Sequence, residues 1–156
     1  MSGKKKKAEI RGLLLPLHAG QLLIPNMLMP EVIGYREPDE IPRGAPDWLL
    51  GEIVWRHFPV PVVSFDALLG APEQEVGHRA RIALCKTITE VSTRPYTALL
   101  IQSIPRLVSV TEKTIEAIEN DKAQIPQIAH HVRINDQEAW IPNLDALEQS
   151  LQEILG

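Results

Sequence analysis

The sequence contains a single cysteine, Cys85, and no long apolar segment. One cysteine cannot form a disulfide within the chain, which suits a reducing cytosol. The apolar runs are far shorter than the roughly 20 residues that span a bilayer. The charges of Glu9 and Arg11 fall where a signal peptide would need its apolar stretch. We therefore expect a cytoplasmic protein that is neither secreted nor embedded in a membrane.

Acidic residues outnumber basic ones, and four of the basic residues lie in one short run near the N-terminus. The net charge is −4, and removing the four positive charges of Lys4 to Lys7 leaves −8 on the rest of the chain. An acidic chain lacks the basic face that phosphate binding requires, so nucleic acid is not expected as a partner. The sequence predicts a disordered basic tail at residues 1–8 and one folded domain at residues 9–156.

Patterns that carry catalytic or cofactor chemistry are also missing. The chain has neither G-x-G-x-x-G nor G-K-[ST], so no phosphate-binding loop is predicted. His130 and His131 are adjacent and would point to opposite faces of a strand, so we interpret both as surface histidines and not as ligands of one metal ion. Cys85 lies in an apolar stretch and is expected to pack there, since a catalytic thiolate needs an electropositive, partly open setting. No catalytic, metal or cofactor site is predicted, and an enzyme is not expected.

Proline and glycine, in contrast, are spread along the whole chain. Thirteen prolines and nine glycines separate short apolar stretches, which is typical of many short strands joined by turns. The pattern predicts a mainly β protein. Residues 36–47 are expected to form an exposed loop, and residues 111–120 a short polar helix or an irregular connection. Strands are expected at residues 12–17, 21–25, 48–55, 60–65, 81–88, 96–104, 106–110, 128–134 and 137–141.

One local pattern occurs twice, about half a chain apart. Residues 64–68 read Ser-Phe-Asp-Ala-Leu and residues 143–147 read Asn-Leu-Asp-Ala-Leu, and each follows a predicted strand. Ser64 and Asn143 suit the N-cap position of a helix, and Gly70 suits the end of the first helix. The second helix continues to the C-terminus with an apolar period of 3.6 residues. The repeat indicates two similar β subdomains.

Residues 55–58, Trp-Arg-His-Phe, are the densest group of aromatic and basic side chains. Trp and Arg dominate the energetically important parts of protein–protein interfaces. The alternative is that Trp55 fills the core while the alkyl stem of Arg56 covers it. Composition alone leaves both open.

Three segments resemble the CheW-like family of chemotaxis adaptors, in the right order and over nearly the whole chain. Residues 24–32 resemble the family's "L-P-x-x-x-V-x-E-I", residues 51–65 its "G-x-I-N-L-R-G-x-x-x-P-V-x-D-L", and residues 99–107 its "L-L-V-D-S-V-x-x-V". The resemblance implies a pair of five-stranded, SH3-like β-barrels with a short C-terminal helix.

The same resemblance implies a non-catalytic scaffold. Family members couple the cytoplasmic tip of methyl-accepting chemoreceptors to the regulatory domain of a chemotaxis histidine kinase, so the protein would be recruited to receptor arrays. By motif position, Met29, Glu31 and Arg56 are the predicted protein-binding residues. The alternatives are core burial for Met29, a solvated charge for Glu31 and an internal ion pair for Arg56. A small-molecule-binding regulatory β-barrel is the competing function.

The chain departs from the family pattern at four positions. Val54 replaces Asn, His57 replaces Gly, and Ser64 and Gln102 each replace Asp. Histidine tolerates a left-handed backbone less well than glycine, so the turn at residues 54–58 is expected to differ. These departures indicate a divergent branch, such as an accessory adaptor of a pilus-type chemosensory system or a copy that has lost one partner.

Overall fold

A computed structural model describes residues 9–39, 41–87, 94–119 and 125–156. The predicted tail at residues 1–8 lies outside these ranges. Strands are the main regular structure of the described chain, which also has two α-helices and one 3₁₀ turn, and this confirms the predicted mainly β class. The elements are β1 (Ile10–Pro16), β2 (Gln21–Pro25), η1 (Asn26–Leu28), β3 (Glu31–Gly34), β4 (Leu49–Trp55), β5 (Phe58–Val63), α1 (Phe65–Leu68), β6 (Arg81–Lys86), β7 (Tyr96–Ile101), β8 (Arg106–Val110), β9 (Ile115–Ile118), β10 (Ile128–Ile134), β11 (Gln137–Pro142) and α2 (Leu144–Leu155).

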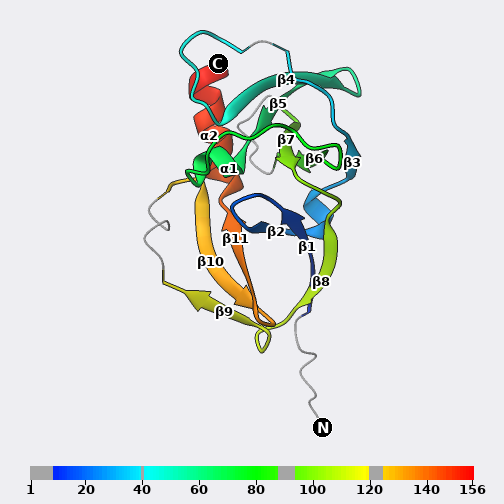
Figure 1. Ribbon diagram of the computed structural model, residues 1–156, viewed down its shortest axis with the longest axis vertical. Coiled ribbons are helices and arrows are strands. Elements are labelled where there is room, and N and C mark those ends of the chain that lie inside the picture. The colour runs from blue at the N-terminus through cyan, green and yellow to red at the C-terminus, as the bar shows by residue number, and fades with distance from the viewer. Residues whose placement is uncertain (1–8, 40, 88–93, 120–124) are drawn as a thin grey trace.

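The strands form two sheets, which lie one above the other along the long axis of the molecule (Figure 1). One has the order β8-β1-β2-β11-β10-β9 and is called here the six-stranded subdomain; the other has the order β3-β6-β7-β5-β4 and is called the five-stranded subdomain. The chain begins in the first, crosses to the second, and returns. Two subdomains were expected, each with five strands.

The extra strand is β9, within the segment where the sequence predicted a helix or an irregular connection. That prediction is wrong for Ile115–Ile118. The Thr114 amide donates to the Thr111 carbonyl at 3.1 Å, which turns the chain back so that β9 pairs with β10. A four-residue edge strand with two exposed central side chains carries little alternation for a sequence pattern to reveal.

One close backbone approach helps to close the five-stranded subdomain. Gly51 has φ +140°, and a Cβ built there would lie 2.0 Å from the Asp39 carbonyl oxygen. The Asp39 amide donates to the Glu52 carbonyl at 2.9 Å, which fastens the segment that follows β3 to β4. A side chain at position 51 would push this segment away, so glycine is required there.

Two prolines sit inside β5 without breaking its pairing with β4. Pro59 is opposite Val54, and Pro61 is opposite Glu52. Trp55 and Phe58 close the two-residue turn as a hydrogen-bonded pair, and hydrogen-bonded and non-hydrogen-bonded pairs alternate along the two strands. Both prolines therefore fall in non-hydrogen-bonded pairs, where no N–H group is directed at β4. β7 pairs with β5 only at Val62 and Val63, beyond the prolines. The missing N–H groups therefore cost the sheet no bond.

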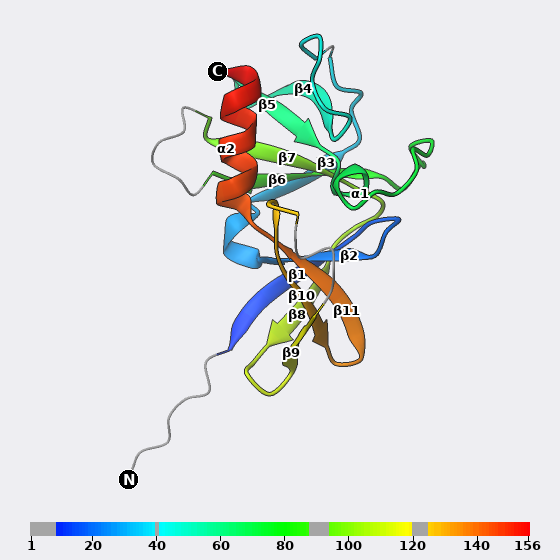
Figure 2. The same ribbon diagram turned by 90° about the vertical axis from the view of Figure 1, so that its left-hand side faces the viewer.

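Both predicted helix caps are present. The Ser64 hydroxyl accepts from the Ala67 amide at 3.2 Å, and the Asn143 side chain accepts from the Ala146 amide at 3.0 Å. α2 stands beside the five-stranded subdomain (Figure 2) and buries Leu147 and Leu151 in a core that draws on both sheets. Each fully buried leucine contributes about 1.5–3 kcal/mol, so α2 joins the two subdomains through one shared core. Among the described residues, no helix is long and apolar enough to cross a membrane.

Candidate protein-docking site

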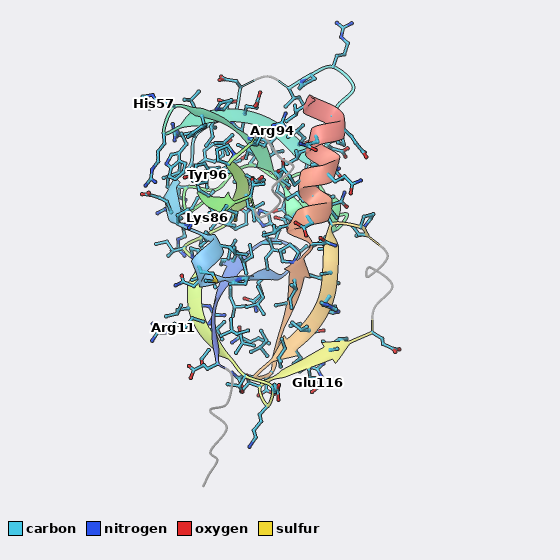
Figure 3. The ribbon with its side chains drawn as sticks, turned by 180° about the vertical axis from the view of Figure 1, so that it is seen from behind. Arg11, His57, Lys86, Arg94, Tyr96 and Glu116 are labelled. Carbon is cyan, nitrogen blue, oxygen red and sulfur yellow. The ribbon has the colours of Figure 1, made fainter. Side chains whose placement is uncertain are left out.

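The β4–β5 hairpin carries Arg56 at its tip. Trp55 pairs with Phe58, so Arg56 and His57 form a two-residue turn. Their φ values are +48° and +71°, as a type I′ turn requires at both central positions. The backbone thus keeps the left-handed conformation that suits glycine even though His57 stands in the turn. His57 lies at the outer end of the hairpin, with Tyr96 further in (Figure 3).

Arg56 forms an ion pair with Glu31, which the sequence had placed in the same site. The Arg56 Nη2 atom donates to Glu31 Oε2 at 3.2 Å. β3 and β4 are opposite edges of the five-stranded sheet order, so this pair connects the two edges through side chains. The two side chains remain 59% and 42% exposed, so the pair lies on the surface and can meet a partner.

The guanidinium of Arg56 is also held by an aromatic ring. Its central carbon lies 4.3 Å from the centroid of the Trp55 ring, a cation–π contact. Trp55 is buried and meets Tyr96 edge-to-face at 4.7 Å. Trp55 therefore fills the core, as one alternative for this segment expected. Arg56 lies over the Trp55 ring with its side chain exposed, so it remains available for an interface.

Apolar side chains flank the exposed arginine. Val54 is 61% exposed and Phe58 43% exposed, and the Phe58 ring meets Tyr96 at 6.1 Å. Arg36 lies beside them, where its Nη1 atom donates to the Val54 carbonyl at 3.0 Å. The hairpin end, defined here as residues 54–58 with Glu31 and Arg36, combines fixed charges with exposed apolar area. Protein interfaces have this composition.

Met29, the third predicted binding residue, does not share this surface. It is 7% exposed and belongs to the core that joins the two subdomains, so its burial supports the core alternative. Met27, two residues earlier in η1, is 78% exposed. The motif did not reveal that Met27 is exposed and Met29 is buried, because the 3₁₀ turn reorients the chain directly after Pro25.

Cys85 and His131 are both buried. Desolvation raises the pKa of the Cys85 thiol to about 12, which keeps it protonated and supports its packing role. His131 was interpreted as a surface residue, and that is wrong: its ring stacks on Trp140 at 3.9 Å, and its Nε2 atom lies 3.3 Å from Glu138. His130 is exposed on the other face of β10, as expected. The described part of the chain contains no group of three His, Cys, Asp or Glu side chains able to hold a metal ion.

A cleft of about 550 Å³ opens where the subdomains meet, beside α1. The buried Asp66 is among its lining residues, and its carboxylate accepts from the His18 and Ala19 amides at 3.1 and 2.7 Å. Gln102 Nε2 also approaches Asp66 Oδ2, at 3.4 Å. Asp66 therefore fastens α1 to the β1–β2 turn of the other subdomain.

Comparison with known proteins agrees with this architecture. The model of the family described as CheW-like domain matches residues 11–152. The fold is similar to the crystal structure of the scaffolding protein TtCheW from Thermoanaerobacter tengcongensis, with a TM-score of 0.72 and 15% sequence identity over 87% of this chain and 90% of that one. Comparison with curated proteins gives no match. Since the family match spans most of the sequence, this chain belongs to the CheW-like domain family.

Proposed function

We propose that this protein is a non-catalytic adaptor that couples chemoreceptors to a chemotaxis-type histidine kinase. Its partners are the regulatory domain of the kinase and the cytoplasmic tip of a methyl-accepting chemoreceptor, and it acts in the cytoplasm at receptor arrays. Membership of the CheW-like family supports this role, as does the likeness to a protein described as a scaffold. The departures from the family motif favour an accessory branch, such as a pilus-type system.

The observation that carries the proposal is the Glu31–Arg56 pair on the hairpin end. Arg56 is fixed from two sides, by the Glu31 carboxylate and by the Trp55 ring, yet its side chain is 59% exposed. A prepositioned guanidinium loses less conformational entropy on binding than a free one. Within the described ranges, Glu31 is the one hydrogen-bond partner of the Arg56 side chain, which leaves further N–H groups for a partner.

The same geometry separates binding from folding. An exposed ion pair contributes about 0–1 kcal/mol to stability, so loss of Arg56 leaves the fold almost intact. A central arginine anchor in an interface contributes more than 2 kcal/mol to binding, which is roughly a 30-fold change in affinity. Affinity and thermal stability therefore respond differently to one substitution.

Calorimetric titration of the kinase regulatory domain and of a chemoreceptor cytoplasmic fragment, both from the organism that carries this chain, tests the proposal. Arg56→Ala is expected to weaken at least one of the two complexes by tenfold or more while Tm changes by roughly 3 °C or less. Arg133→Ala is the matched control, because Arg133 forms an exposed ion pair with Glu116 at 3.5 Å on the six-stranded subdomain. Equal affinities for both variants and the wild type would contradict the docking role of Arg56.

The cleft beside α1 supports the alternative of a small-molecule-binding regulatory barrel. Its volume of about 550 Å³ lies within the range of ligand pockets. A thermal-shift screen of metabolites without any protein partner discriminates the two functions. A saturable rise in Tm that is lost with Asp66→Asn, combined with no binding to kinase or receptor fragments, would favour the ligand-binding alternative.

A further inference from the structure

Two β-hairpins in the described part of the chain close with type I′ turns that have similar backbones but different residues. Asn135 and Asp136 join β10 to β11 with φ values of +45° and +69°, close to those of Arg56 and His57. Asn and Asp are among the residues that favour left-handed backbone in such turns. Arginine is not among them, and the Cβ of histidine still raises the energy of this backbone relative to glycine, so the β4–β5 turn is more strained than the β10–β11 turn.

Contacts of Arg56 offset this strain, but His57 has none that would. Arg56 binds Glu31 and lies over Trp55. Among residues 9–39, 41–87, 94–119 and 125–156, the His57 side chain makes no hydrogen bond, ion pair or ring contact, and it is exposed at the outer end of the hairpin (Figure 3). The imidazole therefore gives the folded monomer nothing in return for its unfavourable backbone. Strain that the monomer does not need is characteristic of functional positions.

We propose that His57 is a partner-contact residue that helps to select the protein bound at the hairpin end. This inference rests on the proposed function, since it concerns the same surface. Positive charge indicates the chemistry of the partner. The guanidinium groups of Arg36 and Arg56 both lie at the hairpin end, where Arg36 donates to the Val54 carbonyl and Arg56 pairs with Glu31. The occupant is a folded protein surface that presents a carboxylate to the imidazole. A glycine at position 57 would let a partner's backbone approach the turn closely. The imidazole ring of His57 blocks that approach and so excludes partners that depend on it.

The test uses the full chain and whichever fragment, kinase regulatory domain or chemoreceptor tip, loses affinity with Arg56→Ala. His57→Gly is expected to raise Tm by roughly 2–4 °C and to weaken that complex at least fivefold. His57→Asn, which tolerates the left-handed backbone and keeps hydrogen-bonding groups, is expected to bind more tightly than His57→Gly. Asp136→Gly is the matched control in the other turn and is expected to leave affinity unchanged.

The outcomes separate this inference from the proposed function. Unchanged affinity with His57→Gly, while Arg56→Ala still weakens binding, overturns the role of His57 and leaves the docking surface in place. Equal weakening by Asp136→Gly, in the hairpin of the other subdomain, assigns the effect to a general loosening of the fold by glycine and also overturns the role of His57. A His57→Gly variant that is less stable than the wild type overturns it as well. If Arg56→Ala weakens neither complex, the docking surface itself fails, and this inference with it.

Discussion

The Gln102 side-chain amide lies 3.4 Å from the carboxylate of Asp66, and each residue also bonds the backbone of the other subdomain. Asp66 belongs to α1, and Gln102 directly follows β7, where the chain crosses to β8. The backbone amide of Gln102 donates to the Pro16 carbonyl at 2.8 Å. The CheW-like motif has Asp at position 102. In this chain an aspartate there would meet the buried Asp66 carboxylate, so the glutamine suits its surroundings.

Gln102→Asp is therefore expected to destabilise the protein by about 1–2 kcal/mol near neutral pH, because two carboxylates would share one partly buried site. Chemical denaturation measures this change. The difference from the wild type is expected to shrink as pH falls toward about 4, where the carboxylates bind protons. Gln102→Asn, which adds no charge, is the control. If the Gln102→Asp variant is as stable as the wild type at pH 7, the contact at 3.4 Å does not contribute to the free energy of unfolding.

Gly51 provides a second test, directed at the closure of the five-stranded subdomain. Gly51→Ala is expected to lower the free energy of unfolding by about 2–4 kcal/mol, since a Cβ would meet the Asp39 carbonyl oxygen and φ is +140°. Gly34→Ala is the matched control, because no atom lies within 4 Å of a Cβ at that position and its backbone is not left-handed. Thermal unfolding of the two variants should differ clearly, and similar Tm values would contradict the close approach.

Cys85 predicts a dependence on alkaline pH. Its folded-state pKa is raised to about 12 by burial, whereas an exposed thiol titrates at about 8.5. Above the unfolded value, the unfolded chain loses the thiol proton and the folded chain keeps it, so unfolding becomes easier. The contribution of Cys85 to stability is expected to fall by roughly 1.4 kcal/mol per pH unit between about 9 and 12.

Cys85→Ala removes this contribution, so the stability difference between wild type and variant should narrow as pH rises from 8 to 10.5. Native protein is also expected to resist alkylation by iodoacetamide at pH 8 and to react only after unfolding. Rapid alkylation of the folded protein would show that the thiol is accessible and would contradict its burial.

The sequence predicted the features that depend on local chemistry. The bounds expected for β2 and β8 agree with the structure, as do the N-caps at Ser64 and Asn143. These features arise from neighbouring residues, through strand length, turn residues and side-chain bonds to the nearest amides. Ser64 also explains one departure from the family motif, since serine caps a helix as aspartate does.

Features that depend on distant contacts were less predictable. β9 is held by pairing with β10, and the burial of Met29 and His131 results from packing against the remaining core. For the candidate site, motif position grouped Glu31 with Arg56, but it did not predict the contact of Arg56 with the Trp55 ring or the strain at His57. The 25-residue separation between Glu31 and Arg56 is closed only when the sheet curves.

Capture of tagged full-length protein from native lysate of its own organism tests the adaptor role most directly. Wild-type protein should retain both a chemotaxis histidine kinase and a chemoreceptor, each identified by mass spectrometry. The Arg56→Ala variant, at equal concentration and with nearly unchanged Tm, should lose at least one of them, while Arg133→Ala retains both. Recovery of neither partner by the wild type, or of both partners by Arg56→Ala at wild-type levels, would contradict docking through the Glu31–Arg56 pair.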